Sequence, residues 1–314
     1  MIEPKVSILI PCYNQEDVIT EAVLSALNQT YENIEVIVSD DASTDTTPRL
    51  LKELQEQYRQ KLKIFLHETN LGVTENHTRG LSKCTGDYIT FLDGDDLFLP
   101  EKIEKQVAFM KERPNCTICY HDVDVFDSST GRSIYLWSDR IGMRHGNIND
   151  LVRFGNYLPA VAVMVRSRDL PINGYDARIK VYSDWFFWLC ILDNGRGQIF
   201  FIDDVLAKYR RHSDNLTNTA KWKFIDQNLV LDLVEVNWPE FNFEVRMRRS
   251  ELHFMQAVNS LLSNEYRSSV MDFVFALKLG FPFFPWFRLV FREVMFFIRN
   301  GFRSDYMFRS IISS

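Results

Sequence analysis

The stretch Asp87-Tyr88-Ile89-Thr90-Phe91-Leu92-Asp93-Gly94-Asp95-Asp96 decides how the rest of the chain is interpreted. Its apolar first part predicts a buried strand, and three carboxylates follow within four residues. Ligands of α/β sheets bind at the carboxyl ends of strands. Crowded carboxylates repel one another unless a cation neutralises them, and Mn²⁺ or Mg²⁺ takes oxygen ligands from carboxylates and phosphates. The segment therefore predicts a site for metal-bridged phosphate, whereas capping of the helix that follows Pro100 would explain only one aspartate.

Strand and helix patterns alternate on either side of this stretch. Apolar, β-rich runs at 5–11, 34–39, 62–66 and 117–126 predict strands, and helical spacing predicts helices over 16–28, 47–60 and 74–84. Asp45 is interpreted as a cap of the second helix. The alternation predicts an α/β fold with a mostly parallel sheet and helices on both faces.

The pattern changes from about Thr219 onward, where helices over 251–263 and 268–279 follow one another. A chain of 314 residues has room for two domains, and the predicted domains are 1–218 and 219–314. The second contains 12 Lys and Arg against 10 Asp and Glu, while the whole chain contains 36 against 42. The acidic excess therefore belongs to the first domain.

Composition excludes several classes of function. No glycine precedes Gly72, so the first strand-to-helix turn lacks the glycine-rich cradle of a P-loop or dinucleotide-binding fold. A net charge of −6 argues against a nucleic-acid partner. Five scattered cysteines fit a reducing cytosol better than a disulfide framework. Cys116 and Cys119 are expected on opposite faces of one strand, which would keep them from sharing a metal.

Several motifs, in this order, resemble the inverting family 2 glycosyltransferases of the GT-A fold. Val6–Asn14 is similar to the family's opening strand and nucleotide-contacting turn, and Val36–Asp45 to its second strand and base-binding acidic turn. Asn70–Gly72 and Asn76–Gly80 resemble its third loop and helix, and Asp93-Gly94-Asp95 its aspartate-any-aspartate signature. The resemblance covers roughly residues 4–216. It implies a GT-A catalytic domain over 1–218 and a smaller α-helical domain after it.

The resemblance also implies a role for each matching residue. The donor is expected to be a nucleotide sugar, with UDP as the preferred nucleotide, and Asp41 would accept a hydrogen bond from the base, with Asp40 as its substitute. Asp96 would support the metal site. The implied donor-binding residues are Pro11, Tyr13, Glu16, Asp41, Arg79, Asp93, Arg210 and Arg211. The implied ligands of Mn²⁺ or Mg²⁺ are Asp93, Asp95 and His212.

Tyr182-Ser183-Asp184-Trp185 opens a predicted aromatic helix with one acid near its start. A carboxylate beside aromatic side chains is partly desolvated, which raises its pKa toward the range that suits a general base. The family has a Glu-Asp pair here. The resemblance implies that Asp184 deprotonates the acceptor hydroxyl, although Ser183 replaces the Glu. The alternative is that Ser183 or Asp184 caps the helix.

Tyr209-Arg210-Arg211-His212 resembles a family segment in which a histidine closes over the donor diphosphate and can bind the metal. A neutral imidazole can be a metal ligand, and a guanidinium can neutralise phosphate charge. The remaining histidines show no metal-ligand spacing and are interpreted as solvated or structural. They are His67, His77, His121, His145 and His253.

The implied reaction is a single in-line displacement that inverts the anomeric carbon. The sugar would pass to a hydroxyl of a glycan or lipid-linked acceptor in bacterial surface polysaccharide biosynthesis. The alternative is a catalytically weak scaffold that keeps the fold and recruits partners through its helical tail. A glycoside hydrolase would not need a strand that ends in three acids, and a nucleotidyltransferase would want a glycine-rich first loop.

Four arginines near the carboxyl terminus are spaced to share one face of an aromatic helix: Arg288, Arg292, Arg299 and Arg303. This pattern predicts a helix that lies in an anionic membrane interface. The alternative is packing against the catalytic domain or against a second subunit of a homo-oligomer. Because no secretion signal or membrane span is recognised, the expected location is the cytoplasm, at the cytoplasmic face of the inner membrane.

Overall fold

The computed structural model describes residues 3–212, 215 and 220–280. The chain divides into two compact units. The first is Met1–Ile148 with Leu158–His212, and the second is Asn149–Tyr157 with Ser213–Ser314. The second unit thus includes a short segment from within residues 1–218, and the predicted division of function at residue 218 stays a prediction.

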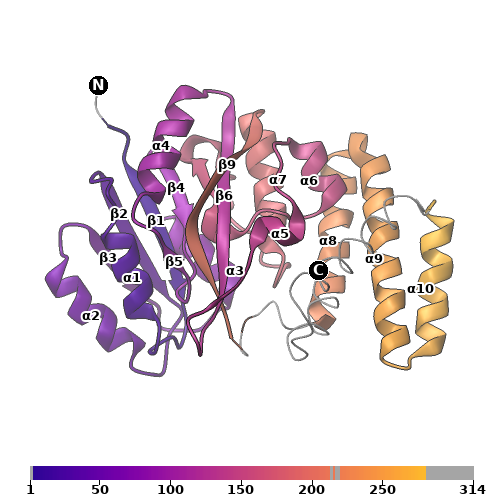
Figure 1. The fold of residues 1–314 in the computed structure, drawn as a ribbon, viewed down its shortest axis with the longest axis horizontal. Helices are drawn as coiled ribbons and strands as arrows, with labels where there is room; N and C mark the ends of the chain where they lie inside the picture. Colours follow the sequence, from indigo (N-terminus) through magenta and orange to yellow (C-terminus); the bar gives the residue numbers. More distant parts are fainter. Residues whose placement is uncertain (1–2, 213–214, 216–219, 281–314) are drawn as a thin grey trace. The chain divides into compact units, whose positions relative to one another are not determined.

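The first half of the sheet in the first unit is parallel (Figure 1). Its strands are β1 (Val6–Cys12), β2 (Ile34–Asp40), β3 (Leu62–Leu66) and β4 (Tyr88–Phe91), in the order β3-β2-β1-β4. Every residue of β1, β2 and β4 is buried. Strands that are covered on both faces have near-continuous apolar sequences, which is why all three were recognisable.

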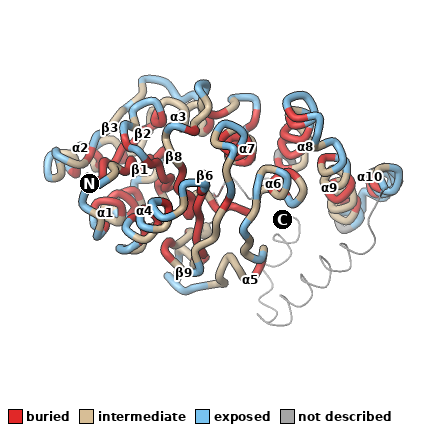
Figure 2. The backbone as a smooth tube through the Cα atoms, turned by 90° about the horizontal axis from the view of Figure 1, so that it is seen from above, coloured by how far each residue is buried: buried red, intermediate tan, exposed pale blue. Residues whose placement is uncertain are grey.

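Helices cover both faces of these strands. Figure 2 shows α3 (Val73–Leu81) on one side of β1, and α1 (Ile19–Leu27) and α4 (Lys102–Glu112) on the other. The helix α2 (Thr47–Gln57) packs on β3. Gly80 lets α3 lie close to the sheet, because a Cβ there would be 2.5 Å from Cδ1 of Leu9 and 3.0 Å from Cβ of Ser39. The predicted α/β fold class is confirmed.

The second half of the sheet mixes directions. Its strands are β5 (Leu97–Phe98), β6 (Cys116–Asp127), β7 (Ser133–Leu136), β8 (Met164–Arg166) and β9 (Gln198–Arg211), and the order continues β4-β8-β6-β9-β5 with β7 on β6. β8 is antiparallel to β4 and β6, β5 is antiparallel to β9, and β6 and β9 are parallel. The mostly parallel arrangement therefore applies to the part up to β4.

The two cysteines of β6 do not behave as a regular strand predicts. The register of β6 against β9 shifts between Cys116 and Ile118, and such an irregularity breaks the alternation of faces. Burial and a hydrogen bond with the Cys116 thiol raise the pKa of Cys119 well above its ordinary value. The expectation of opposite faces is therefore wrong. Both thiols are buried and free, and no cluster of three or more potential metal ligands exists among the described residues.

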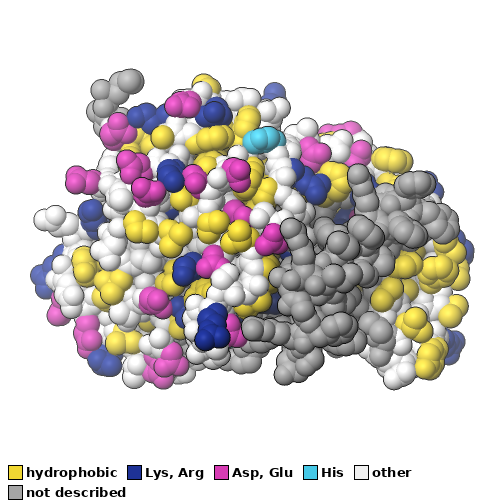
Figure 3. Space-filling model, in the orientation of Figure 1, with side chains coloured by type: hydrophobic (Ala, Val, Ile, Leu, Met, Phe, Trp, Pro, Cys, Tyr) yellow, Lys and Arg dark blue, Asp and Glu magenta, His cyan; other side chains and the backbone are white. Residues whose placement is uncertain are grey.

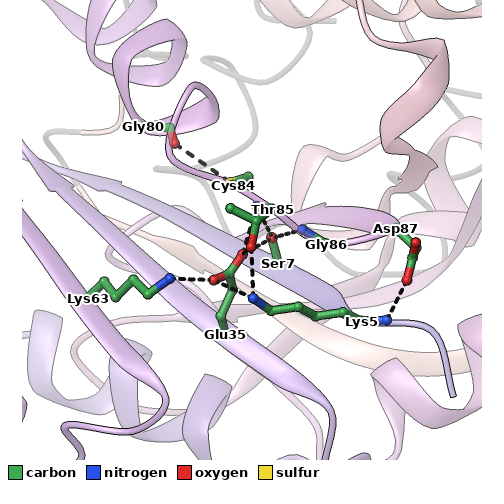
Figure 4. A network of polar contacts seen from close by, with 9 residues as sticks. All are labelled: Lys5, Ser7, Glu35, Lys63, Gly80, Cys84, Thr85, Gly86 and Asp87. Carbon is green, nitrogen blue, oxygen red and sulfur yellow. Dashed lines mark hydrogen bonds and ion pairs between the residues drawn. The ribbon is translucent and has the colours of Figure 1, made fainter. Parts of the chain in front are cut away.

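A polar network fixes the amino ends of the parallel strands (Figure 4). Glu35 of β2 accepts hydrogen bonds from Lys5 Nζ at 2.8 Å, Lys63 Nζ at 2.8 Å, Ser7 Oγ at 2.7 Å and the Thr85 N–H at 2.7 Å. Burial disfavours the carboxylate form, but these hydrogen bonds prevail and lower the pKa of Glu35 far below its usual value. The network therefore stabilises the sheet at the end opposite the predicted site.

The second unit is helical, as predicted for the carboxyl-terminal part. It contains α8 (Ala220–Asn237), α9 (Asn242–Leu262), α10 (Tyr266–Lys278) and most of α6 (Ile148–Phe154). Glu251 of α9 forms an ion pair with Arg153 of α6 at 2.8 Å, and His253 of α9 pairs with Asp272 of α10 at 2.8 Å.

No described helix is long and apolar enough to cross a bilayer. The arginine face at residues 288–303 lies outside the described residues.

Candidate active site

The carboxyl ends of β1, β2 and β4 meet at one edge of the sheet. Cys12 is in register with Asp40, and Leu9 with Phe91. The loops that follow these strands carry half of the predicted donor-binding residues, namely Tyr13, Glu16, Asp41 and Asp93. The parallel arrangement brings together residues as far apart in sequence as Leu9 and Phe91, as expected for ligand sites of α/β sheets.

The loops after β1 and β2 are joined by hydrogen bonds. Glu16 accepts from the Thr46 N–H at 2.9 Å and from Thr46 Oγ1 at 2.6 Å, and Asn14 Oδ1 accepts from the Thr44 N–H at 2.8 Å. Pro11 is buried within β1, whereas Tyr13 is 45% exposed. Glu16 thus holds the two loops together, and both Tyr13 and Glu16 are exposed.

Asp45 lies just before α2, whose N-cap is Thr46. Its carboxylate accepts hydrogen bonds from the Thr47 N–H at 2.9 Å and the Glu16 N–H at 3.1 Å. Burial opposes ionisation, but these hydrogen bonds lower the pKa of Asp45. The side chain therefore satisfies the first N–H of the helix, as its interpretation as a cap requires.

Asp41 is only 2% exposed and holds the loop that leads into α3. Its two carboxylate oxygens accept from the Leu71 N–H at 3.0 Å and the Gly72 N–H at 2.8 Å. Gly72 has φ of +90°, a backbone conformation that glycine adopts without strain. Each oxygen has a second lone pair, so a contact with a base stays a prediction. The neighbouring Asp40 accepts from the Ser43 N–H at 3.0 Å.

The antiparallel pairing of β5 with β9 brings the carboxyl end of β9 beside the three aspartates. Leu97 is in register with Lys208, so the chain from Arg210 onward runs along Asp95 and Asp96. Asp96 is 1% exposed and accepts from the Arg210 N–H at 2.8 Å. Burial, followed by the charges of Asp95 and Asp93, raises the pKa of Asp96 well above its ordinary value. Asp96 therefore stabilises the aspartate loop through a buried hydrogen bond to the backbone of β9.

The side chain of Arg210 already has partners within the protein. It is buried and donates to the Asp95 carbonyl at 2.6 Å and to Glu21 Oε2 at 2.6 Å. These contacts show that Arg210 fixes the aspartate loop, and its predicted contact with phosphate stays a prediction. The guanidinium of Arg211 lies 5.8 Å from the centre of the Tyr209 ring.

His212 and Asp95 form the pair that best fits a divalent cation. His212 Nε2 lies 2.8 Å from Asp95 Oδ2, although the two residues are 117 positions apart. Mg²⁺ is commonly held by one or two carboxylates together with phosphate oxygens, and carboxylates suit Mn²⁺ as well, whereas imidazole is more typical of later transition metals. Asp93, the third predicted ligand, contacts a different residue. A metal site at this pair therefore stays a prediction, and the pair alone would need further ligands.

That different residue is His77 on α3, which the sequence placed among the solvated or structural histidines. Its side chain is 13% exposed, and its Nε2 lies 3.7 Å from Asp93 Oδ1. Arg79, the predicted donor contact on the same helix, pairs with Glu75 at 3.3 Å. His77 was missed because its proximity to Asp93 depends on how α3 packs, and no spacing in the sequence reports that.

Asp184 is the second residue of α7 (Ser183–Gly195) and is half-buried. Its Oδ1 accepts from the Trp185 N–H at 2.8 Å, and Trp185 itself is buried. The N-cap is Tyr182, and no side chain caps the helix by a hydrogen bond. Burial opposes protonation of His77, but Asp93, the Val73 carbonyl and, last, the charge of Asp184 raise the pKa of this imidazole.

The chain is similar in sequence to a known family and to several known proteins. Residues 7–166 match the family described as Glycosyl transferase family 2. The Bacillus subtilis protein EpsE, a proposed glycosyltransferase, is 40% identical over 238 residues, which are 73% of this chain and 81% of EpsE. An uncharacterized glycosyltransferase of Haemophilus influenzae is 39% identical over 70% of this chain and 86% of its own. An uncharacterized Mycobacterium tuberculosis protein is 31% identical, and the match spans 61% of its length.

Solved structures share the fold. The mannosyltransferase PcManGT from Pyrobaculum calidifontis, solved with GDP-Man and Mn²⁺, aligns with a TM-score of 0.63 at 15% identity, over 99% of this chain and 86% of that one. Residues 1–349 of Staphylococcus aureus TarS, solved with UDP-GlcNAc, align with a TM-score of 0.61 at 18% identity, over 96% of this chain and 83% of that one. The α/β unit with a helical carboxyl-terminal part is thus a known arrangement.

Proposed function

The chain belongs to glycosyl transferase family 2, and from this membership we propose that it is an inverting glycosyltransferase. It would move a sugar from a nucleoside-diphosphate sugar, with UDP as the preferred nucleotide, to a hydroxyl group. The acceptor would be a glycan or a lipid-linked saccharide in bacterial surface polysaccharide assembly.

The observation that carries this proposal is the arrangement of acids around one edge of the sheet. Asp95 pairs with His212 at 2.8 Å, Asp93 lies 3.7 Å from His77, and Asp184 lies at the start of α7. A donor-side group of acids and a separate acid at the start of a helix are what a direct displacement requires, because leaving group and nucleophile need different partners.

On the donor side, the loops after β1 and β2 would hold the nucleotide. Tyr13 is exposed, and Asp41 lies at the base of the third loop. Pro11 and Glu16 would shape this part of the site, and Arg79 and Arg211 would contact the sugar-phosphate. Asp93 would contact the ribose.

Asp95 and His212 would hold a divalent cation, Mn²⁺ or Mg²⁺, with Asp93 close by. When bound, such an ion would offset the charge that develops on the departing diphosphate. Arg210 would keep Asp95 in place through the 2.6 Å hydrogen bond to its carbonyl.

On the acceptor side, Asp184 would take the proton of the attacking hydroxyl. Trp185, Phe187 and Trp188, which follow it on α7, are buried, whereas Asp184 itself is half-buried. Attack from the Asp184 side would invert the configuration at the anomeric carbon.

The test measures transfer or hydrolysis of radiolabelled nucleotide sugars with Mn²⁺. A thermal-shift panel of UDP-, GDP- and dTDP-sugars would first identify the donor, because a ligand of the folded state raises the melting temperature. Asp184→Asn should then retain donor binding and lose most turnover. If the variant turns over at a rate near that of the wild type, Asp184 is not the base.

We also propose that the protein associates with the cytoplasmic face of the membrane through its carboxyl-terminal part. The arginine face of residues 288–303 supports this. So do exposed apolar side chains on α10, visible at the right of Figure 3: Val270, Met271, Phe273, Val274, Phe275 and Leu277. A homo-oligomer that covers these side chains is the competing explanation.

A further inference from the structure

His77 contacts one carboxylate of the proposed site and packs toward the helix that carries another. Its Nε2 lies 3.7 Å from Asp93 Oδ1 on the donor side. Its ring lies 5.0 Å from that of Tyr175, which in turn stacks on Phe187 of α7, the helix of Asp184. Burial opposes protonation of the imidazole, but Asp93, the Val73 carbonyl and Asp184 prevail and raise the pKa of His77.

The orientation of the His77 ring is fixed by its own helix. Nδ1 lies 2.8 Å from the carbonyl oxygen of Val73. A carbonyl can only accept a hydrogen bond, so Nδ1 carries the proton of this contact. The opposite nitrogen, Nε2, is consequently directed away from the helix backbone and toward Asp93.

Three residues on one face of α3 hold the segment that leads into α7. Thr74, His77 and Thr78 have the i, i+3, i+4 spacing that places side chains together on a helix. Thr74 Oγ1 donates to the Ile179 carbonyl at 2.8 Å, and Thr78 Oγ1 accepts from the Tyr175 N–H at 3.0 Å. The His77 and Tyr175 ring centres are 5.0 Å apart.

The approach of this segment to α3 is close because it begins with a glycine. Gly174 has φ of +67°, and a Cβ there would be 2.7 Å from Cγ2 of Thr78. A side chain at this position would push the segment away from the helix.

Stacked rings continue the contact from His77 to the helix of the proposed base. Tyr175 stacks on Phe187 with ring centres 3.9 Å apart and planes 15° apart. Phe187 is buried and lies one turn after Asp184 on α7. Burial, then the charges of Asp184 and Asp93, raises the pKa of the Tyr175 hydroxyl.

We propose that His77 is a positioning residue that sets the Asp93 carboxylate relative to Asp184. The ring contacts Asp93 directly and fixes the start of α7 through Tyr175. The roles of the two acids are taken from the proposed function, whereas the contact between His77 and Asp93 is independent of it. Reacting groups that move apart by about 1 Å lose about 100-fold in rate, so the role is measurable.

The kinetic test compares His77→Gln with His77→Asn, using hydrolysis of UDP-GlcNAc in the presence of Mn²⁺. The amide nitrogen of Gln reaches about as far as Nε2 and can donate to Asp93, whereas Asn ends near the position of Nδ1. We expect H77N to lower kcat about 10- to 100-fold with little change in KM, and H77Q to recover most of the loss. Equal kcat values for the two variants, or an effect on KM alone, would overturn the assignment.

A second measurement needs no activity. The chain has six histidines, so a ¹⁵N–¹H spectrum of their rings is simple, and H77Q identifies the His77 signals by their loss. At constant pH, Asp93→Asn and Tyr175→Leu should each shift the His77 Nε2 signal in the ligand-free protein. Ser82→Ala, an exposed substitution at the end of α3, should not.

An Nε2 signal that is unchanged in D93N would overturn the inference. If the wild type neither binds nor hydrolyses any nucleotide sugar, the proposed function fails, while the spectrum still decides whether His77 holds Asp93.

Discussion

Asp95 depends on residues from the far end of the first unit. Its carboxylate contacts His212, and its backbone carbonyl accepts from Arg210. Asp96 depends on the same segment through the Arg210 N–H. Single substitutions in β9 should therefore change the chemistry of a loop that is distant in sequence.

His212→Ala should raise the Mn²⁺ concentration needed for half-maximal hydrolysis by about tenfold or more, because loss of a metal-binding side chain weakens the site. The measurement is a Mn²⁺ titration of the initial rate. His145→Ala is the matched control, since that residue accepts a hydrogen bond from the Phe201 N–H and belongs to no predicted site. An unchanged Mn²⁺ dependence in H212A would exclude His212 as a ligand.

At the residue scale, the sequence predicted that the aspartates after β4 form one cluster, but it did not predict which residues contact them. The run Asp93–Asp96 stands out because charges rarely follow a buried strand so densely. No local sequence pattern reveals the contacts of His77 and Arg210, because these contacts depend on how α3 and β9 pack. Cys116 and Cys119 were misjudged for a related reason, since a register shift in β6 cannot be read from alternation.

Helix α3 connects the donor edge of the sheet to the segment before α7, and its distance from the sheet matters. Gly80→Ala should destabilise the protein by about 1–2 kcal/mol, because the new methyl group would meet Leu9 and Ser39. The gain in helix propensity from alanine, up to about 1 kcal/mol, offsets part of this.

Urea unfolding of G80A and of the control Ser82→Ala would measure the effect. Stability of G80A equal to or above that of the wild type would mean that α3 can move away from the sheet without loss.

The Glu35 network makes the amino ends of β1, β2 and β3 sensitive to acid. Because the pKa of Glu35 is lowered in the folded protein, its contribution is complete above the unfolded value of about 4.3 and is lost as the pH falls below that value. Glu35→Gln should cost about 1–3 kcal/mol at pH 7, and the difference from wild type should shrink toward pH 3.

Urea unfolding at pH 7, 5 and 3.5 tests this expectation. Glu53→Gln, in an exposed pair with Arg49, should change stability by at most about 0.5 kcal/mol at each pH. A difference between E35Q and wild type that does not change with pH would contradict the assignment.

At the element scale, the fully buried strands were predicted, whereas the short strands and the long but partly exposed β9 were not. β1 and β2 each have seven buried residues, and their pattern is unambiguous. β5 has two residues and β8 has three, which is too few for a periodicity to show. They are strands only because neighbouring strands supply their hydrogen bonds.

At the scale of the whole molecule, charge and apolar surface are distributed unevenly. The acidic excess lies in residues 1–218, whereas residues 219–314 carry 12 basic against 10 acidic side chains. In the second unit, α10 exposes Val270 and Met271 by more than 60% of their surface. The carboxyl-terminal part is therefore the candidate for contact with a membrane surface or with a second copy of this chain.

Arg288→Glu combined with Arg292→Glu in the full chain should reduce sedimentation with liposomes that contain anionic lipid, because each basic residue contributes about 1 kcal/mol near such a surface. Neutral liposomes are the control. If the wild type sediments with neither anionic nor neutral liposomes and elutes as a dimer from a sizing column at all concentrations, a homo-oligomer explains the exposed apolar side chains better than a membrane does.

The position of β9 between β6 and β5 has a consequence for the order of events during synthesis. A ribosome that has just passed Phe98 has already made all three aspartates, but their partners Arg210 and His212 are more than 100 codons away. Nascent chains in that interval contain the complete acidic signature but lack its contacts with Arg210 and His212, so a donor that binds as proposed would not yet favour the folded state. Such binding would therefore assist only the last stage of folding, after the whole of β9 has left the exit tunnel.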